Sequence, residues 1–188
     1  MFSSRLSLAL WRRRFKYRAK KVAASSGAGR TKWLVLKAKA AQMIELREKE
    51  LGQLTKHFHI DEFACHDGTG YIEGLVKEQF LSARDARGRA VRLARYLEKV
   101  RAAHGNKPLH LNSVFRTKAY NKSIGGAKNS AHTRGFAVDS TPPVGVSLGR
   151  HREVCRAVFP SGVGFYPQAN FVHGDFDPVL GRRDWVGP

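Results

Sequence analysis

Residues 130–139 read SAHTRGFAVD, and residues 170–175 read NFVHGD. A glycine between His132 and Asp139 marks a turn, so a loop side chain and a side chain of the following strand can point to one centre. The apolar stretch around His173 predicts another strand, in which alternate side chains share a face. The two stretches therefore predict a region of short strands where two histidines and a carboxylate approach one another.

These three side chains have two interpretations. A catalytic zinc site commonly has three protein ligands, drawn from histidine and carboxylate, and a fourth position for water. His132, Asp139 and His173 match that donor set. They can equally be ordinary polar or core histidines and a surface carboxylate, because spacing alone does not distinguish the two cases.

The hydrophobic pattern outward from these stretches predicts the fold. Alternation or short apolar runs predict strands at 108–115, 135–140, 162–167 and 171–176, and periodic apolar positions predict helices at 83–103 and 147–159. Residues 119–135 are rich in loop-forming residues. Helices and short strands in this order predict an α+β fold, with flanking helices around a mainly antiparallel sheet that carries the candidate zinc site.

The beginning of the chain has a different composition. Residues 5–21 predict a basic amphipathic helix, residues 22–30 have linker composition, and residues 31–50 predict a second helix. We therefore expect a basic helical extension over 1–52, followed by a compact domain over 53–188.

Charge narrows the range of partners. The chain of 188 residues has a net charge of +19, and its first thirty residues contain nine Lys or Arg and no Asp or Glu. Such a segment favours polyanions. We expect residues 5–21 to bind an anionic membrane or wall polymer. Nucleic acid is the weaker alternative, and a solvated tail packed on the domain is a third.

The amino-terminal sequence also bears on export. The apolar run LSLAL at 6–10 is short and precedes the arginines, whereas a secretion signal carries its positive charges first. This order predicts synthesis in a cytoplasm without a classical export route. The sequence predicts no particular oligomeric state.

Longer motifs carry a resemblance to a known family. Residues 113–139 read SVFRTKAYNKSIGGAKNSAHTRGFAVD, and residues 162–175 read GVGFYPQANFVHGD. They resemble the zinc peptidases of the D-Ala-D-Ala carboxypeptidase / L-alanyl-D-glutamate peptidase group, and most closely its small bacterial and phage branch, which cuts peptidoglycan. The resemblance covers about residues 57–185.

The resemblance implies roles for individual residues. It makes His132, Asp139 and His173 the ligands of a Zn²⁺ cofactor. Arg116 takes the place of an arginine that binds substrate and steadies charge at the scissile carbonyl, which suits a guanidinium with paired donors. Ser130 matches a serine that lines the substrate cleft, and its alternative role is to cap the loop.

One position departs from the family pattern. Many relatives carry Glu or Asp three residues before the last histidine, where this chain has Asn170. An amide cannot accept the proton of an attacking water. Asp175 is our candidate for the missing general base, and its alternative role is to fix the tautomer of a ligand histidine.

Together these features predict a zinc metallopeptidase that hydrolyses peptidoglycan stem peptides or cross-links containing D-amino acids. The cationic chain without a secretion signal favours a phage-encoded lysin or a virion-associated enzyme, acting at the cell wall after release or carried in a virion. The motifs do not distinguish carboxypeptidase from endopeptidase. The alternative is a non-catalytic zinc-containing module that binds cell wall or a partner.

Some chemically conspicuous residues have a structural interpretation. His151 and Cys155 share the inner side of a predicted helix and are expected in the core, and Cys65 is expected to be a small buried residue. Trp185 is expected to pack the carboxyl terminus rather than to bind substrate.

Overall fold

The computed structural model describes the backbone of residues 4–188 and the side chains of residues 12–42 and 51–188. The chain divides into two compact units, Met1–Gln53 and Leu54–Pro188. In the described part of the chain, no helix is both long enough and apolar enough to cross a membrane.

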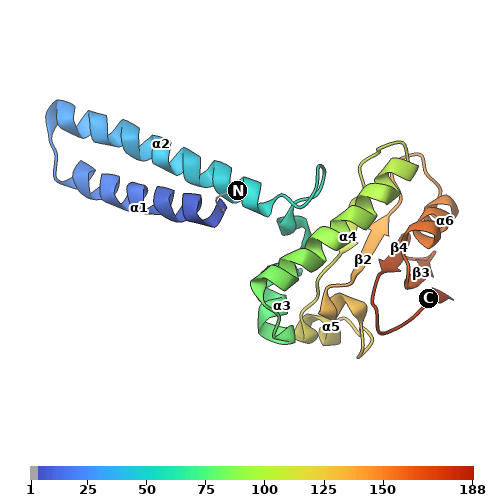
Figure 1. Ribbon diagram of the computed structural model, residues 1–188. Coiled ribbons are helices and arrows are strands. Elements are labelled where there is room, and N and C mark those ends of the chain that lie inside the picture. Colours follow the sequence, from blue (N-terminus) through green and yellow to red (C-terminus); the bar gives the residue numbers. More distant parts are fainter. Residues whose placement is uncertain (1–3) are drawn as a thin grey trace. The chain divides into compact units, whose positions relative to one another are not determined.

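The first unit is a helical hairpin. Helix α1 (Ser4–Ala23) and helix α2 (Gly27–Gly52) run side by side and are joined by three residues (Figure 1). The rings of Tyr17 and Trp33 meet edge to face at 6.1 Å, and Arg18 Nη1 donates to the carbonyl oxygen of Leu36 at 2.7 Å. These contacts hold the two helices together.

The linker predicted at residues 22–30 is longer than the observed connection, because α2 begins at Gly27. This glycine has φ +55°, which allows the tight turn between the helices. Of the predicted apolar stripe, Leu8 and Trp11 lie outside the described side chains, whereas Phe15 and Ala19 are half-buried.

The second unit contains a five-stranded sheet. The strand order is β1-β2-β4-β3-β5, and every pair is antiparallel except β3 with β5. The strands are β1 (His110–Ser113), β2 (Ala137–Thr141), β3 (Gly162–Tyr166), β4 (Phe171–Asp175) and β5 (Arg183–Val186). The predicted α+β class with a mainly antiparallel sheet is confirmed.

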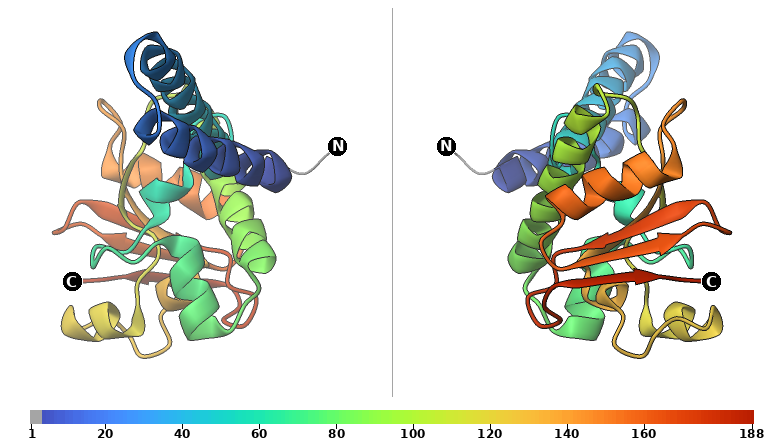
Figure 2. Two further views of the ribbon diagram at one scale, coloured as in Figure 1. Left: turned by 90° about the vertical axis from the view of Figure 1, so that its left-hand side faces the viewer. Right: turned by 90° about the vertical axis from the view of Figure 1, so that its right-hand side faces the viewer.

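Helices surround this sheet (Figure 2). Helix α6 packs on β3 and β4 and also contacts α4, so these two helices lie on one side of the sheet. The helices are α3 (Tyr71–Gln79), α4 (Ala83–Ala103), α5 (Lys118–Ser123) and α6 (Leu148–Val158), with 3-10 helices η1 (Ile60–Phe63) and η2 (Ala131–Arg134). Ser82 and Ser147 cap α4 and α6 through their hydroxyl oxygens.

The core lies between helix α4 and the sheet. Leu93 and Leu97 on α4 are fully buried, as are Val163 on β3 and Val172 on β4. The apolar period predicted for residues 83–103 is confirmed, because these positions form the buried face of α4. His151 and Cys155 are buried with 0% and 1% exposure, and Cys65 is also buried, as predicted.

Candidate metal centre

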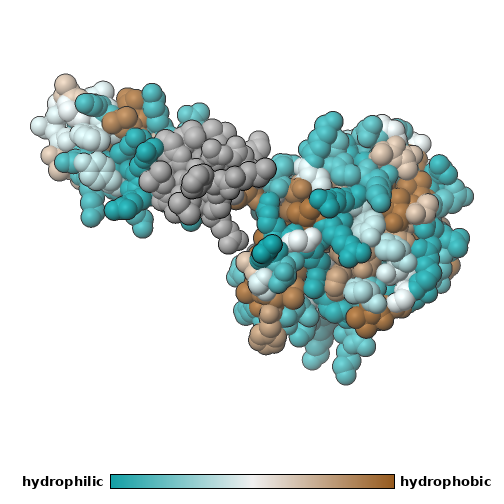
Figure 3. Space-filling view, in the orientation of Figure 1, coloured by the Kyte–Doolittle hydropathy of each residue, from teal (hydrophilic) through white to brown (hydrophobic). Residues whose placement is uncertain are grey.

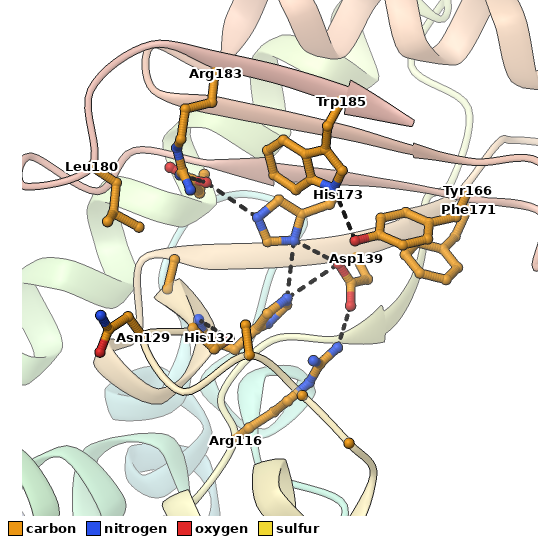
Figure 4. A pocket seen from close by; sticks show the side chains of 16 residues that line it. Arg116, Asn129, His132, Asp139, Tyr166, Phe171, His173, Leu180, Arg183 and Trp185 are labelled. Atoms are coloured by element: carbon orange, nitrogen blue, oxygen red, sulfur yellow. Dashed lines mark hydrogen bonds and ion pairs between the residues drawn. The ribbon is translucent and has the colours of Figure 1, made fainter. Parts of the chain in front are cut away.

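Three separate elements supply the candidate ligands (Figure 4). His132 lies in η2, Asp139 in β2 and His173 in β4. Asp139 and His173 are directly opposite each other in the antiparallel β2–β4 pair, so their side chains share a face. Gly135, with φ +70°, ends η2 and turns the chain into β2. Local structure therefore positions all three side chains.

The three ligand atoms form a small triangle. His132 Nε2 lies 3.1 Å from Asp139 Oδ1 and 3.1 Å from His173 Nδ1, and His173 Nδ1 lies 2.9 Å from Asp139 Oδ1. All three residues are buried, with exposures of 2%, 4% and 8% for His132, Asp139 and His173. The atoms meet the geometric requirement for a shared metal ion.

Neighbouring groups define the tautomers. His132 Nδ1 lies 2.7 Å from the carbonyl oxygen of Val114, so this nitrogen carries the proton. His173 Nε2 lies 3.2 Å from Asp175 Oδ2 and donates to that carboxylate. With both rings neutral, two nitrogen lone pairs and an oxygen of Asp139 face one another with no proton between them. Such a set of acceptors is stabilised by a cation.

The donor set fits zinc. A tetrahedral ion with bonds of about 2.0–2.1 Å separates its ligand atoms by about 3.3 Å, close to the sides of this triangle. Two imidazoles and one carboxylate also leave one coordination position open. The residues present can therefore hold a catalytic zinc ion.

The electrostatics favour an ionised Asp139 beside a neutral His132. Burial raises the pKa of Asp139, but contacts with His132 and His173 outweigh it and hold the pKa far below its usual range. Burial lowers the pKa of His132. Burial also opposes charge on His173, but its hydrogen bonds with Asp139 and Asp175 raise its pKa overall. The centre thus contains an ionised carboxylate and attracts positive charge.

Arg116 contacts the outer oxygen of the ligand carboxylate. Its Nη2 donates to Asp139 Oδ2, and its Nε donates to Ser113 Oγ at 2.8 Å. Arg116 also lines the cavity beside the ligand triangle. Its guanidinium therefore orients Asp139 and presents positive charge next to the position expected for substrate.

Asp175 lies behind the ligand histidine. It is fully buried, and its Oδ2 accepts from His173 Nε2 and, at 2.6 Å, from Arg183 Nη2. Burial raises its pKa, but His173 and Arg183 outweigh burial, so the pKa is lowered overall. The ring of His173 separates Asp175 from the ligand atoms. This position favours the tautomer-fixing role over the role of general base.

Ser130 and Asn170 have local structural roles. Ser130 Oγ accepts from the backbone N–H of His132 at 3.3 Å and caps η2, and the residue also lines the cavity. Asn170 is exposed in the turn before β4 and has φ +52°, a conformation that asparagine tolerates better than most residues. The turn therefore accounts for the amide at this position.

A cavity of about 300 Å³ opens beside the ligand triangle. One wall is aromatic: the Trp185 ring lies 5.2 Å from that of His173, and Trp185 Nε1 donates to Tyr166 Oη at 3.0 Å. Tyr166 in turn stacks on Phe171 at 4.4 Å. Trp185 packs against Gly164 of β3, and the β3–β5 pairing also brings its ring into the cavity wall, which the sequence did not predict.

A buried set of two histidines and one carboxylate, open to a cavity, is a donor set that mononuclear metallohydrolases use. The chain belongs to the peptidase M15 family, which its residues 56–175 match. The resemblance inferred from the motifs is confirmed.

Individual relatives agree with this assignment. Peptidoglycan L,D-endopeptidase MepK of Escherichia coli K12 is 33% identical over 130 residues, which cover 63% of this chain and 69% of the relative. The probable MepK of Haemophilus influenzae is 41% identical over 66 residues, covering 35% and 33%. The zinc D-Ala-D-Ala carboxypeptidase of Streptomyces albus G is 41% identical over 59 residues, covering 31% and 23%.

Proposed function

We propose that this protein is a zinc-dependent peptidase that hydrolyses peptide bonds in peptidoglycan stem peptides or cross-links. The observation that carries the proposal is the buried triangle of three potential ligand atoms, His132 Nε2, Asp139 Oδ1 and His173 Nδ1, beside a cavity. The names of the relatives, two of them peptidoglycan endopeptidases and one a zinc carboxypeptidase, support the substrate class.

Each residue of the centre has a defined task in this proposal. Bound zinc supplies a water of lowered pKa and polarises the scissile carbonyl. Val114 and Asp175 keep the protons of His132 and His173 on the outer ring nitrogens, so the inner nitrogens remain ligands. Arg116 holds Asp139 and stabilises the negative charge that develops on the carbonyl oxygen.

Purified peptidoglycan tests the activity directly. We expect wild-type protein to release new peptide termini, chelator to abolish the release and added zinc to restore it. His132→Ala and His173→Ala should lose both bound zinc and activity, whereas the exposed His110→Ala control should retain both. Stoichiometric zinc without new termini on any wall type would instead identify a non-catalytic binding module.

We also propose that the hairpin, through residues 5–21, docks the enzyme on an anionic membrane or wall polymer. Residues 12–42 contain eleven Lys or Arg and no Asp or Glu, and hydrophilic side chains cover much of the described hairpin (Figure 3). Basic helices bind such interfaces through their cationic side chains. The enzyme would then act at the cell wall, while a phage or virion origin stays a prediction.

Deletion of residues 1–30 separates docking from catalysis. We expect the truncated protein to cleave purified wall as the full chain does but to lyse whole cells more weakly. Equal loss in both assays would contradict docking. Tight, salt-sensitive DNA binding by the full chain that the truncation abolishes would support the nucleic-acid alternative instead.

A further inference from the structure

A second cavity, of about 200 Å³, adjoins the first. The two cavities share Arg116, Asp139 and Phe171 in their walls, so they meet at the ligand carboxylate and its arginine. The residues particular to the second cavity come from the segment after η1, from β1, and from α5 and the residue that follows it. They are His66, Asn112, Ser113, Tyr120 and Ile124.

A β-bulge builds this second cavity. The β1–β2 register shifts between Leu111 and Ser113, which makes Asn112 the extra residue. The carbonyl oxygen of Asn112 lies 2.7 Å from His66 Nε2, and its side-chain oxygen accepts from Thr141 Oγ1 at 2.9 Å. Asn112 therefore has no partner residue in the β1–β2 ladder, and its backbone carbonyl holds the imidazole of His66 at the cavity wall.

The bulge also sets the chemistry of His66. Its Nε2 donates to the Asn112 carbonyl, so Nδ1 carries a lone pair and can accept a hydrogen bond. The His66 ring lies 5.9 Å from that of Tyr120, and Ile124 is 48% exposed. An acceptor beside an aromatic ring and an aliphatic side chain suits a ligand that combines an N–H or ammonium donor with a short aliphatic part.

The charges of the two cavities differ. The larger cavity is lined by Arg183 and Asp175 as well as by the shared Arg116 and Asp139, whereas the described lining of the smaller one adds no charged side chain to that shared pair. Recognition in the smaller cavity therefore depends on the acceptor nitrogen of His66 and the ring of Tyr120, not on an additional charge.

We propose that the smaller cavity is a substrate subsite that binds the amine-bearing part of the peptide, through a hydrogen bond to His66 Nδ1 and contact with the Tyr120 ring. The peptide then crosses the ligand triangle and occupies both cavities. This inference rests on the proposed peptidase function and deepens it, because it names specificity residues outside the metal centre.

Steady-state kinetics on soluble cross-linked muropeptide dimers test the subsite. We expect His66→Ala to raise KM by about tenfold or more, as for loss of a hydrogen bond to a charged group, with kcat changed less than twofold. His66→Gln, which keeps an acceptor, should recover part of the affinity, and Tyr120→Leu should also raise KM. His110→Ala, an exposed histidine on the same strand as the bulge, is the matched control.

A binding measurement gives a readout that does not depend on turnover. Zinc-loaded wild-type protein is titrated with uncross-linked muropeptides carrying a free amine, and the histidine ring signals are followed by NMR. The signals of His66 should shift and those of His110 should not. Unchanged His66 signals, or a His66→Ala variant with wild-type KM, would overturn the subsite while leaving the peptidase function intact. A wild type that cleaves no wall would overturn the peptidase function itself.

Discussion

Replacing Asp175 with asparagine distinguishes the two roles considered for this carboxylate. Asp175 Oδ2 accepts from both His173 Nε2 and Arg183 Nη2, and Oδ1 accepts from the backbone N–H of Asp177 at 3.2 Å. An amide has one acceptor oxygen, and its NH₂ group cannot accept from either donor. In Asp175→Asn, at least one of these contacts is lost, and the tautomer of His173 is no longer enforced.

The loss of these contacts is expected to weaken zinc binding. Removing an outer carboxylate that holds a ligand histidine weakens metal affinity by about 10–100-fold, or about 1.4–2.7 kcal/mol. Competitive zinc titration measures this change, and the free energy of unfolding of the same variant monitors its folding. Asp184→Asn is the matched control, because Asp184 lies on β5 and pairs with Arg152 and Arg156 instead.

Two results would refute the reasoning. If Asp175→Asn binds zinc as tightly as wild type and retains its activity, the carboxylate does not position His173. If the variant binds zinc normally but loses kcat by several orders of magnitude, Asp175 acts in proton transfer, as the general-base alternative requires.

Three further perturbations follow from the fold. Burial, together with the neighbouring His104, lowers the pKa of His151 to about 4, so the unfolded chain binds a proton first as the pH falls. Stability should therefore drop by up to about 3 kcal/mol between pH 6.5 and 4, and His151→Gln should flatten this dependence in denaturant titrations. Gly164→Ala would place a Cβ 2.6 Å from the Trp185 ring, so we expect about 1–3 kcal/mol of destabilisation and a raised KM; unchanged values would contradict this packing. Leu97→Ala should cost about 2–5 kcal/mol in unfolding free energy without changing zinc affinity, and a loss below 1 kcal/mol would contradict full burial of this residue.

Local pattern was sufficient for the elements with strong periodicity. Helix α4 was predicted with the observed bounds, because apolar residues recur along one face as far as the glycine that follows the helix. Helix α5 was missed, since six residues in a loop-rich stretch carry too few apolar positions for a period. Strand β5 was missed because half of its residues are exposed and its partner β3 is distant along the chain.

The candidate site likewise contains residues that local sequence predicts and residues that it does not. The positions of His132, Asp139 and His173 follow from motifs in short stretches, so the sequence alone could name them. The aromatic wall and the second cavity depend on pairings between distant segments, which motif spacing does not encode. Trp185 illustrates the difference: the alternation in RDWV hints at a strand, but only the β3–β5 pairing shows which cavity it faces.

The direct opposition of Asp139 and His173 across β2 and β4 has a consequence for assembly of the fold. A slip of one residue between two strands turns every side chain of one strand to the opposite face, so a displaced register would separate the carboxylate from the imidazole. An ion that requires both groups therefore binds a single alignment of these central strands. During folding the ion would select the native register of β2 and β4. Loss of the ion should therefore destabilise the pairing of these central strands.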